Sequence, residues 1–379
     1  MKQLAILALT LGVVSTFAPT LSAQLLYAGT YTTPKTGSKG IYAYRFDAKT
    51  GKLTSIGLAA ESSNPTFLAV HPNGKFLYAI NEDNEFQGKK TGSVSAFSID
   101  KASGKLTLLN QVSSASPGPC HLVVDATGKA VLVANYAGGS FSSFPLAADG
   151  KLGEAASFIQ ETGGSVDASR QKAPHGHSIV LTKNNKFAVG ADLGTDHVNV
   201  FKVDAAAGKI TPNDPAFGTV KPGSGPRHSA IAPDQKHLYV LSEMASTVTT
   251  FDFDAEKGTM KEIDSVSTLP SDFKGKSTTA EIFTDAAGKF VYASNRGHDS
   301  IAVFAVDAAT GKLKFLHTES TGGKTPRGFM IDPSGNYIVA GNQDTNSIAV
   351  LKIDRKTGKL APVSEKVDLG APVTFAFVK

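Results

Sequence analysis

The sequence contains no tryptophan and only one cysteine, Cys120, among its 379 residues. A single thiol cannot close a disulfide within the chain, so the fold must be held by its apolar core, and we interpret Cys120 as structural. Charged residues make up 19% of the chain, the net charge is +5, and no run of basic residues stands apart from the acidic ones. This composition does not indicate a nucleic-acid partner.

Long apolar runs are also missing, with one exception near the N-terminus. Residues 1–23 contain an early Lys2, an apolar run from Leu4 to Val14 and a small-residue end before Gln24. The run is shorter than the roughly 20 residues that a membrane span needs. The order of charge, apolar core and small residues is that of a secretory signal peptide. We predict cleavage near Gln24, a periplasmic or secreted protein, and no membrane contact after cleavage.

Helical periodicity is not visible in the remaining chain, and a short turn pattern recurs instead. It consists of an Asp, a few small or polar residues, a Gly, usually a Lys, and an apolar residue. The seven copies lie at residues 47–53, 100–106, 149–152, 204–210, 254–260, 307–313 and 354–360. Asp can bond the backbone ahead of it, and Gly accepts the positive φ of a hairpin loop. Because the copies follow alternating strands such as 41–46, we predict that each turn closes a β-hairpin.

A second pattern, a turn between two apolar strands, lies between these copies. Six full copies are visible at residues 67–82, 122–136, 178–193, 229–243, 281–296 and 328–343. Successive turns of the first kind end 46 to 58 residues apart, which is enough for four short strands and their turns. Seven four-stranded units predict an all-β fold, a seven-bladed β-propeller.

The two ends of the chain supply the missing seventh half-repeat. Residues 25–32 (LLYAGTYT) are similar to the second strand of a unit, and residues 372–378 (PVTFAFV) match the strand that precedes it in other units. We predict that these strands pair and close the ring, which removes an exposed sheet edge. Residues 24–379 then form one domain. Two separate β-sandwiches, the structural alternative, would not give one repeat period from end to end.

Polar residues gather where the innermost strands are predicted to begin. In a propeller these strands line the axial channel, so the residues at their starts converge on one mouth. The residues at these positions are His121, His175, His177, Arg227, His228, Glu281 and Arg327. The ends of the second strands add another polar ring, formed by Asn81-Glu82, Asn135-Tyr136, Asp192, Ser242-Glu243, Asn295-Arg296 and Asn342-Gln343.

These residue types favour recognition of an anion. Arg227, Arg296 and Arg327 carry guanidinium forks that bind carboxylate or phosphate with two bonds, although a structural salt bridge across the channel is an alternative. His175 and His177, one residue apart on a strand, are predicted to project to the same face as general bases, oxyanion donors or zinc ligands. No metal-binding motif is present, so we predict no metal. A Gly-x-Ser-x-Gly elbow is also missing, which argues against a serine nucleophile. The strand-end asparagines fit bonds to turn backbones at least as well as ligand contacts.

Five short motifs follow one another along the second half of the chain and the segment just before it. They are APHGHS at 173–178, DLGTD at 192–196, GSGPRH at 223–228, YASNRGHDSIAVF at 292–304 and TPRGFMIDPSGNYIVAGNQ at 325–343. Together they resemble the bacterial propeller-type 6-phosphogluconolactonase family, a lactonase family related to the fungal carboxymuconate lactonising enzymes. The resemblance implies a seven-bladed propeller that acts on lactone rings without an obligatory cofactor. It implies catalytic residues at His175 or His177, Arg227, Glu243 and Arg296, although Ser242 stands where an Asn is common.

The resulting hypothesis is a lactonase that hydrolyses a small anionic sugar-acid lactone, similar to 6-phosphogluconolactone, at the channel mouth. Glu243 or His177 would take a proton from the attacking water, and Arg227 and Arg296 would stabilise the oxyanion. Arg327 with His228 would hold a substrate phosphate or carboxylate. The full set of residues predicted to bind the substrate is His121, Asp192, His228, Glu281, Arg327 and Gln343.

Two other functions stay open on the sequence alone. A propeller can be a non-catalytic module that binds a ligand or a protein, and a cycloisomerase of the muconate-lactonising type would use the same residues with a proton donor to carbon. Sugar phosphates are scarce outside the cytoplasm, so export favours an unphosphorylated sugar-acid lactone. We predict that the protein acts as a monomer.

Overall fold

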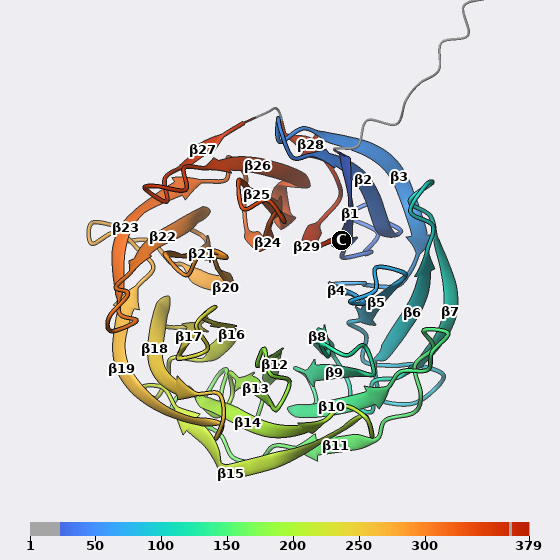
Figure 1. Cartoon of the computed structure of the whole chain (residues 1–379), viewed down its shortest axis with the longest axis horizontal. Coiled ribbons are helices and arrows are strands. Elements are labelled where there is room, and N and C mark those ends of the chain that lie inside the picture. The colour runs from blue at the N-terminus through green and yellow to red at the C-terminus, as the bar shows by residue number, and fades with distance from the viewer. Residues whose placement is uncertain (1–22, 364–365, 379) are drawn as a thin grey trace, which may run out of the picture.

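The regular secondary structure of the described residues is almost entirely β-strand, as the alternating sequence patterns predict (Figure 1). The structure is a computed structural model, and it describes residues 23–363 and 366–378. Within those ranges the one helix is the short 3-10 helix η1 (Gln343–Thr345). Residues 1–22, which carry most of the predicted signal peptide, lie outside the described residues. A helix long and apolar enough to cross a membrane is not found in the described part of the chain.

The strands form seven antiparallel sheets around one axis, which confirms the prediction of a seven-bladed propeller (Figure 1). From the axis outward, blade 1 contains β29 (Pro372–Phe377), β1 (Ala23–Thr30), β2 (Gly40–Asp47) and β3 (Leu53–Glu61). Blade 2 contains β4 (Phe67–Val70), β5 (Phe76–Asn81), β6 (Ser93–Ile99) and β7 (Leu106–Ser113). Blade 3 contains β8 (Pro119–Val124), β9 (Ala130–Asn135), β10 (Ser140–Pro145) and β11 (Ser157–Gln160).

The remaining four blades follow the same order. Blade 4 contains β12 (Gly176–Leu181), β13 (Phe187–Asp192), β14 (His197–Asp204) and β15 (Lys209–Thr219). Blade 5 contains β16 (Pro226–Ile231), β17 (His237–Ser242), β18 (Thr247–Asp254) and β19 (Thr259–Ser267). Blade 6 contains β20 (Thr278–Thr284), β21 (Phe290–Arg296), β22 (Ser300–Val306) and β23 (Leu313–Ser320). Blade 7 contains β24 (Pro326–Ile331), β25 (Tyr337–Asn342), β26 (Ser347–Ile353), β27 (Leu360–Pro362) and β28 (Val367–Asp368), which also pairs with β26.

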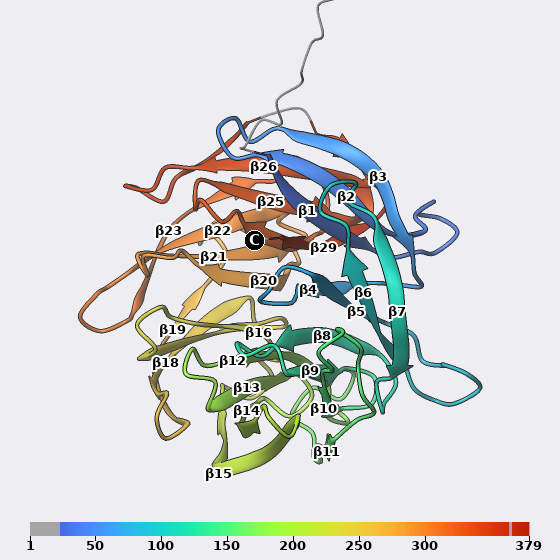
Figure 2. The same ribbon diagram turned by 45° about the vertical axis from the view of Figure 1, so that its right-hand side comes forward.

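Blade 1 is built from both ends of the described chain, as predicted. β29 pairs antiparallel with β1, with Leu26 opposite Phe377 and Ala28 opposite Phe375. Figure 2 shows these two strands lying next to each other. The pairing gives blade 1 its innermost strand, so that β1 has a partner on both sides, and it closes the ring.

The repeated Asp and Gly residues form the turns that the sequence predicts. In the first copy, the Asp47 carboxylate accepts the backbone N–H of Lys49 at 2.8 Å, and Gly51 adopts a φ of +74°. An L side chain is strained at such a φ, which explains the Gly. The turn joins the third and fourth strands of its blade, so the hairpin prediction is confirmed.

The core lies between the blades. Because side chains alternate along a strand, each sheet presents an apolar face to both of its neighbours, and the seven buried clusters each join two adjacent blades. Buried tyrosines on second strands add polar links across these joints. Tyr78 donates its hydroxyl hydrogen to the carbonyl of Gly150 in the next blade at 3.0 Å, and Tyr27 does the same to Gly104 at 3.1 Å.

The innermost strands of six blades share an irregularity near their starts. In each of them the pairing register with the second strand shifts, and one or two residues are left out of the ladder. These bulged residues are Val373 in β29, Cys120 in β8, His177 in β12, Arg227 in β16, Ala280 and Glu281 in β20, and Arg327 in β24. A β-bulge bends the strand and re-aims a side chain, so the bulges select which side chains turn toward the channel mouth.

Candidate active site

A polar cavity of about 280 Å³ lies at the mouth of the channel. Its lining residues are Tyr31, Glu82, Cys120, Tyr136, Arg170, His177, Glu243, Arg296 and Arg327. Three of them, Cys120, His177 and Arg327, are bulged residues of innermost strands. Glu243 follows the second strand β17, and Arg296 ends the second strand β21. Some members of each polar ring expected from the sequence therefore meet in one cavity.

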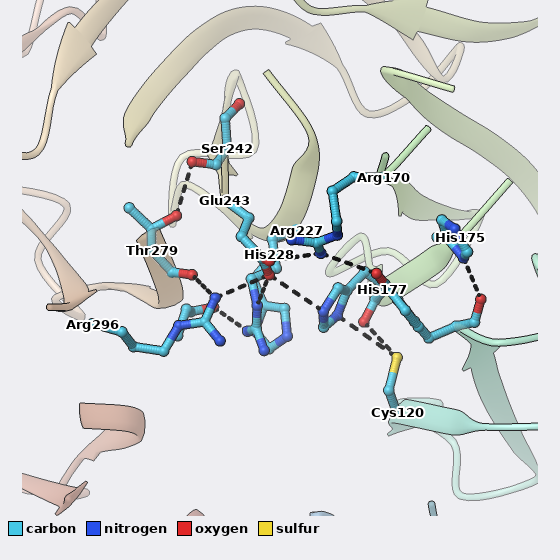
Figure 3. Close-up of polar contacts among 12 residues, drawn as sticks. Cys120, Arg170, His175, His177, Arg227, His228, Ser242, Glu243, Thr279 and Arg296 are labelled. Atoms are coloured by element: carbon cyan, nitrogen blue, oxygen red, sulfur yellow. Dashed lines mark hydrogen bonds and ion pairs between the residues drawn. The ribbon is translucent and has the colours of Figure 1, made fainter. Parts of the chain in front are cut away.

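Glu243 lies at the centre of the polar contacts (Figure 3). Its Oε2 accepts hydrogen bonds from Arg227 Nε and Arg296 Nη2, both at 3.0 Å. Its Oε1 accepts a third bond from Arg170 Nη2 at 2.9 Å. The imidazole Nε2 of His177 lies 3.8 Å from the same Oε2. One buried carboxylate is thus bound by three guanidinium groups and faced by an imidazole.

The guanidinium groups decide the charge of Glu243. Burial of the carboxyl opposes its ionisation, but Arg296, Arg227 and Arg170 outweigh that cost and lower the pKa of Glu243 to about 2. A positive charge next to a carboxyl stabilises its ionised form. Glu243 is therefore a carboxylate over the whole neutral range, and with these three partners it is a weak base.

Arg227 lies beneath the cavity and does not line it. Its side chain is 2% exposed, and it donates from Nε to Glu243 and from Nη1 to the carbonyl of Ala280. Burial, followed by the charge of Arg327, lowers the pKa of the Arg227 guanidinium. We expected Arg227 to face the substrate, but its Nε and Nη1 donate to groups of the protein, so it holds Glu243 in place.

Arg296 has a similar anchor but reaches the cavity. Its Nη2 donates to Glu243 and to the carbonyl of Thr279 at 2.7 Å, while its buried Nε has no hydrogen-bond partner among the described residues. Burial and the neighbouring Arg227 lower the pKa of Arg296 to about 9. Arg296 therefore remains charged at neutral pH and keeps an unused donor.

The two histidines of the APHGHS motif have different surroundings. His177 is the bulged residue of β12 and lines the cavity. Burial and the nearby Arg227 lower the pKa of His177 well below its usual 6.5, so the imidazole is neutral at pH 7. His175 precedes β12, stacks on Tyr136 with ring centroids 4.5 Å apart, and places Nδ1 2.9 Å from the Tyr136 carbonyl. The bulge interrupts the strand alternation on which the prediction of a shared face depended, and His175 does not line the cavity (Figure 3).

Among the described residues, Arg327 is the arginine of the cavity that forms no direct ion pair with a carboxylate, although the charges of Glu82 and Glu243 act on it from further away. Its guanidinium carbon lies 5.4 Å from the centre of the Tyr31 ring, and within the described residues it makes no ion pair within 4.0 Å and no hydrogen bond. Tyr31 instead donates its hydroxyl to Glu82 at 2.9 Å. The Arg327 donors are therefore available to a ligand, as expected for an anion site.

A seven-bladed ring with a carboxylate, an imidazole and several arginines at one mouth narrows the choice of family. The family model described as "Lactonase, 7-bladed beta-propeller" matches residues 25–377. The chain belongs to this lactonase family. Membership makes it an enzyme of the carboxylic ester hydrolase class, as predicted, and favours neither the non-catalytic module nor the cycloisomerase.

Relatives of this lactonase have been named and solved. A 6-phosphogluconolactonase from Bacillus subtilis is 39% identical over 303 residues, which cover 80% of this chain and 83% of that protein. A 6-phosphogluconolactonase from Formosa agariphila is 33% identical over 307 residues, covering 80% of this chain and 85% of that protein. The solved periplasmic gluconolactonase of Pseudomonas aeruginosa superposes with a TM-score of 0.87 at 30% identity, covering 94% of this chain and 99% of that one.

Three residues predicted to bind substrate lie deeper in the lactonase, below the cavity. His228 Nδ1 is 2.7 Å from Glu281 Oε1, and the ring of His121 lies between those of His228 and Phe67, with centroids 5.1 and 3.9 Å away. All four line a second space of about 1060 Å³ on the channel side opposite the mouth, and none lines the 280 Å³ cavity. Burial raises the pKa of Glu281 to about 7. These residues form a layer that supports the floor of the site.

Asp192 and Gln343 also stand apart from the cavity of the lactonase. Asp192 Oδ1 accepts the backbone N–H groups of His175, Gly194 and Thr195, so this carboxylate shapes the loop after β13. Gln343 lies in η1, and its amide bonds the neighbouring Asp344 at 3.2 Å.

The strand-end asparagines form bonds within the protein, as the simpler interpretation of their positions predicts. Examples are the bonds from the hydroxyls of Thr268 and Thr321 to Asn295 and Asn342, both 2.6 Å.

The sequence did not single out every residue that lines the cavity. Arg170 lies in the segment 161–175, which has no strand in the structure and belongs to neither repeat, so no periodic signal marks it. Cys120 occupies the bulge position of blade 3 that His177 and Arg227 occupy in blades 4 and 5. That equivalence could have placed its thiol in the site. Within the described residues, no group of three or more His, Cys, Asp or Glu side chains is arranged to hold a metal ion.

Proposed function

We propose that this lactonase hydrolyses the ring ester of a small sugar-acid lactone that carries an anionic group, in the 280 Å³ cavity. The observation that carries the proposal is the placement of an ionised Glu243, a neutral His177 and an available Arg327 around that cavity. Ester hydrolysis needs a group that takes a proton from water and a donor for the oxyanion. The cavity supplies both types of group.

Glu243 acts as the general base in this proposal. As the water oxygen bonds to the lactone carbonyl carbon, one water proton passes to the Glu243 carboxylate. The neutral His177, 3.8 Å from that carboxylate, holds the water in line. The carbonyl oxygen, now an oxyanion, accepts hydrogen bonds from Arg327. Collapse of this intermediate breaks the ring C–O bond, the ring oxygen takes the proton from Glu243, and the new carboxylic acid releases its proton to solvent.

Arg227 and Arg296 have tasks that differ from that of Arg327. Arg227 is a positioning residue, because its donors are bound to Glu243 and to the Ala280 carbonyl and its side chain is 2% exposed. Arg296 fixes the same carboxylate from the other side and keeps its Nε for the substrate. Preorganised donors of this kind lower the barrier because they need no rearrangement during the reaction.

Localisation and substrate are connected. We propose that residues 1–23 are removed during export and that the single propeller domain, residues 24–379, acts as a monomer in the periplasm or outside the cell. The relative from Pseudomonas aeruginosa, whose name places it in the periplasm, supports this location. An exported enzyme meets few sugar phosphates, so a lactone with a carboxylate is the preferred anionic substrate.

Sequencing of the N-terminus of exported protein should give Gln24, whereas an intact Met1 would contradict export.

The function is tested with three lactones of different charge. Purified protein is assayed on glucono-δ-lactone, which is neutral, on glucaro-1,4-lactone, which carries a carboxylate, and on 6-phosphoglucono-δ-lactone, with the spontaneous rate subtracted. We expect enzymatic hydrolysis, fastest on an anionic lactone. Absence of turnover on all three would contradict a sugar-acid lactonase.

A further inference from the structure

The low pKa of Glu243 conflicts with its proposed role as the general base, and its three arginine partners cause that low pKa. A carboxylate with a pKa of about 2 accepts a proton poorly at neutral pH, because a base works best when its pKa lies near the working pH. Two of its partners are fixed in the protein. The side chains of Arg227 and Arg296 are 2% and 15% exposed, and each also donates to a carbonyl of β20. Neither can leave Glu243 without losing a second buried bond.

The third partner, Arg170, is held differently. Its side chain is 40% exposed, and its Nη2 donates to Glu243 Oε1 at 2.9 Å and to the Tyr136 hydroxyl at 3.0 Å. It comes from the segment 161–175, whereas the other arginines near Glu243 lie on innermost or second strands. Arg170 is therefore the one guanidinium bound to Glu243 that reaches it from the solvent side of the cavity.

The backbone around Arg170 is nevertheless anchored. Asp167 Oδ1 accepts the backbone N–H groups of Ser169 and Arg170 at 2.8 and 3.0 Å. Gln171, which is buried, donates its amide to the Leu193 carbonyl at 2.8 Å. The position of the Arg170 Cα is thus set by bonds that do not involve the guanidinium. Its long side chain can change partners without unfolding the segment.

We propose that Arg170 recognises the anionic group of the substrate and, by leaving Glu243 Oε1 for that group, frees Glu243 to accept the proton of the attacking water. The inference rests on the proposed function and assigns its specificity to one residue. An anionic lactone offers Arg170 a second carboxylate or phosphate, so the guanidinium exchanges one ion pair for another. A neutral lactone offers no such partner, and Arg170 stays on Glu243.

The exchange changes Glu243 through charge alone. Departure of a guanidinium from Oε1 and arrival of a substrate anion nearby both favour the protonated carboxyl. The base therefore becomes effective only when an anionic substrate is bound. No covalent bond is made or broken in this step. The later proton transfer from water to Glu243 is the one already described.

The test compares Arg170→Gln and Arg170→Lys with the wild-type protein. Lys172→Ala is the matched control, since Lys172 is an exposed cation on the same segment and lines no part of the cavity. Each protein is assayed on glucono-δ-lactone, glucaro-1,4-lactone and 6-phosphoglucono-δ-lactone between pH 1.5 and pH 8, so that the acid limb set by Glu243 in the wild-type protein lies within the range. The measured quantities are kcat, KM and the pH of half-maximal kcat/KM on the acid side.

We expect Arg170→Gln to reduce the preference for an anionic over the neutral lactone about tenfold to a hundredfold, as loss of a charged hydrogen bond predicts, mainly through KM. Its kcat on the neutral lactone should rise, because Glu243 loses one cation. The acid limb of kcat/KM should move to higher pH, since a base with a raised pKa is protonated earlier as pH falls. Arg170→Lys should recover part of the preference, and Lys172→Ala should behave like the wild type.

Equal losses on all three lactones, with the acid limb unmoved, would show a merely structural Arg170 and overturn the inference. Unchanged preference in Arg170→Gln would overturn it as well. If the wild-type protein hydrolyses none of the lactones, the proposed function itself fails, which is a distinct result. The two anionic lactones separate the sources of the charge, because the preference lost in Arg170→Gln identifies a carboxylate or a phosphate.

Discussion

Arg227 illustrates how burial decides what a side chain does. The bulge in β16 turns it toward the channel, where its Nε and Nη1 are taken by Glu243 and the Ala280 carbonyl. A buried pair of this kind is costly to break, about 3–5 kcal/mol when one partner is removed. Replacement by Ala would therefore change stability as well as activity, and a smaller change is more informative.

Arg227→Lys keeps the charge but not the fork, because one ammonium cannot reproduce both directional bonds. We expect kcat to fall about 10²-fold through misplacement of Glu243, with KM nearly unchanged, since Arg227 does not line the cavity. Steady-state kinetics on the best lactone would measure both. Arg45→Lys, a change at an outer arginine that donates to the Lys101 and Ala102 carbonyls, is the control. A large rise in KM with kcat preserved would show that Arg227 touches substrate instead.

At the scale of single elements, strand β20 binds both Arg227 and Arg296. Its register shifts between Thr279 and Ile282, and the carbonyls of Thr279 and Ala280 receive Arg296 and Arg227. The next side chain, Glu281, bonds His228 on β16 and its own strand through the Ile282 N–H at 3.0 Å. The bulge is thus fixed from below by Glu281 and presents two acceptors to the site above.

The raised pKa of Glu281 makes this link depend on pH. Burial raises it from 4.5 to about 7, so the folded state favours the protonated form. Its contribution to stability is full below pH 4.5 and is lost as pH rises toward 7. Glu281→Gln cannot ionise, and its free energy of unfolding relative to wild type should increase between pH 4.5 and pH 7.5. Urea unfolding at both pH values measures this, with the exposed Glu262→Gln as control. A difference independent of pH would contradict the assignment.

The innermost strands also show what the sequence could and could not predict. Alternation and the repeated turns were sufficient for the strands, the blade number and the mouth at which His177, Glu243 and Arg296 meet. The bulges were not predictable, because skipping one residue leaves no mark in an alternating pattern. As a result Arg227, His228 and Glu281 were expected to face the substrate, and the structure places them outside the lining of the 280 Å³ cavity. Arg170 was missed because the segment 161–175 has no period.

At the scale of the whole molecule, the ring depends on a joint between the chain ends. β29 is the innermost strand of blade 1, and it packs Phe375 and Phe377 into the cluster shared by blades 7 and 1. Without it, β1 would present unpaired backbone groups toward the channel, and two interblade clusters would lose apolar side chains.

A truncation after Ala371 should therefore prevent formation of a stable propeller. We expect loss of soluble protein, or loss of the cooperative thermal transition seen by circular dichroism, because removal of several buried apolar side chains exceeds the usual stability of a domain. Removal of Lys379 alone is the control. A soluble truncated protein with an unchanged melting temperature would show that the ring does not depend on this joint.

The most direct test of the account is the kcat of Glu243→Gln on the lactone that the wild-type protein hydrolyses fastest. Gln keeps the size and much of the hydrogen bonding of the side chain but cannot take the proton of water at neutral pH. The account predicts a fall of about 10³-fold, within the range of general-base catalysis, in a protein whose circular dichroism is unchanged. A folded Glu243→Gln protein that retains wild-type kcat would contradict the assignment of Glu243 as the base.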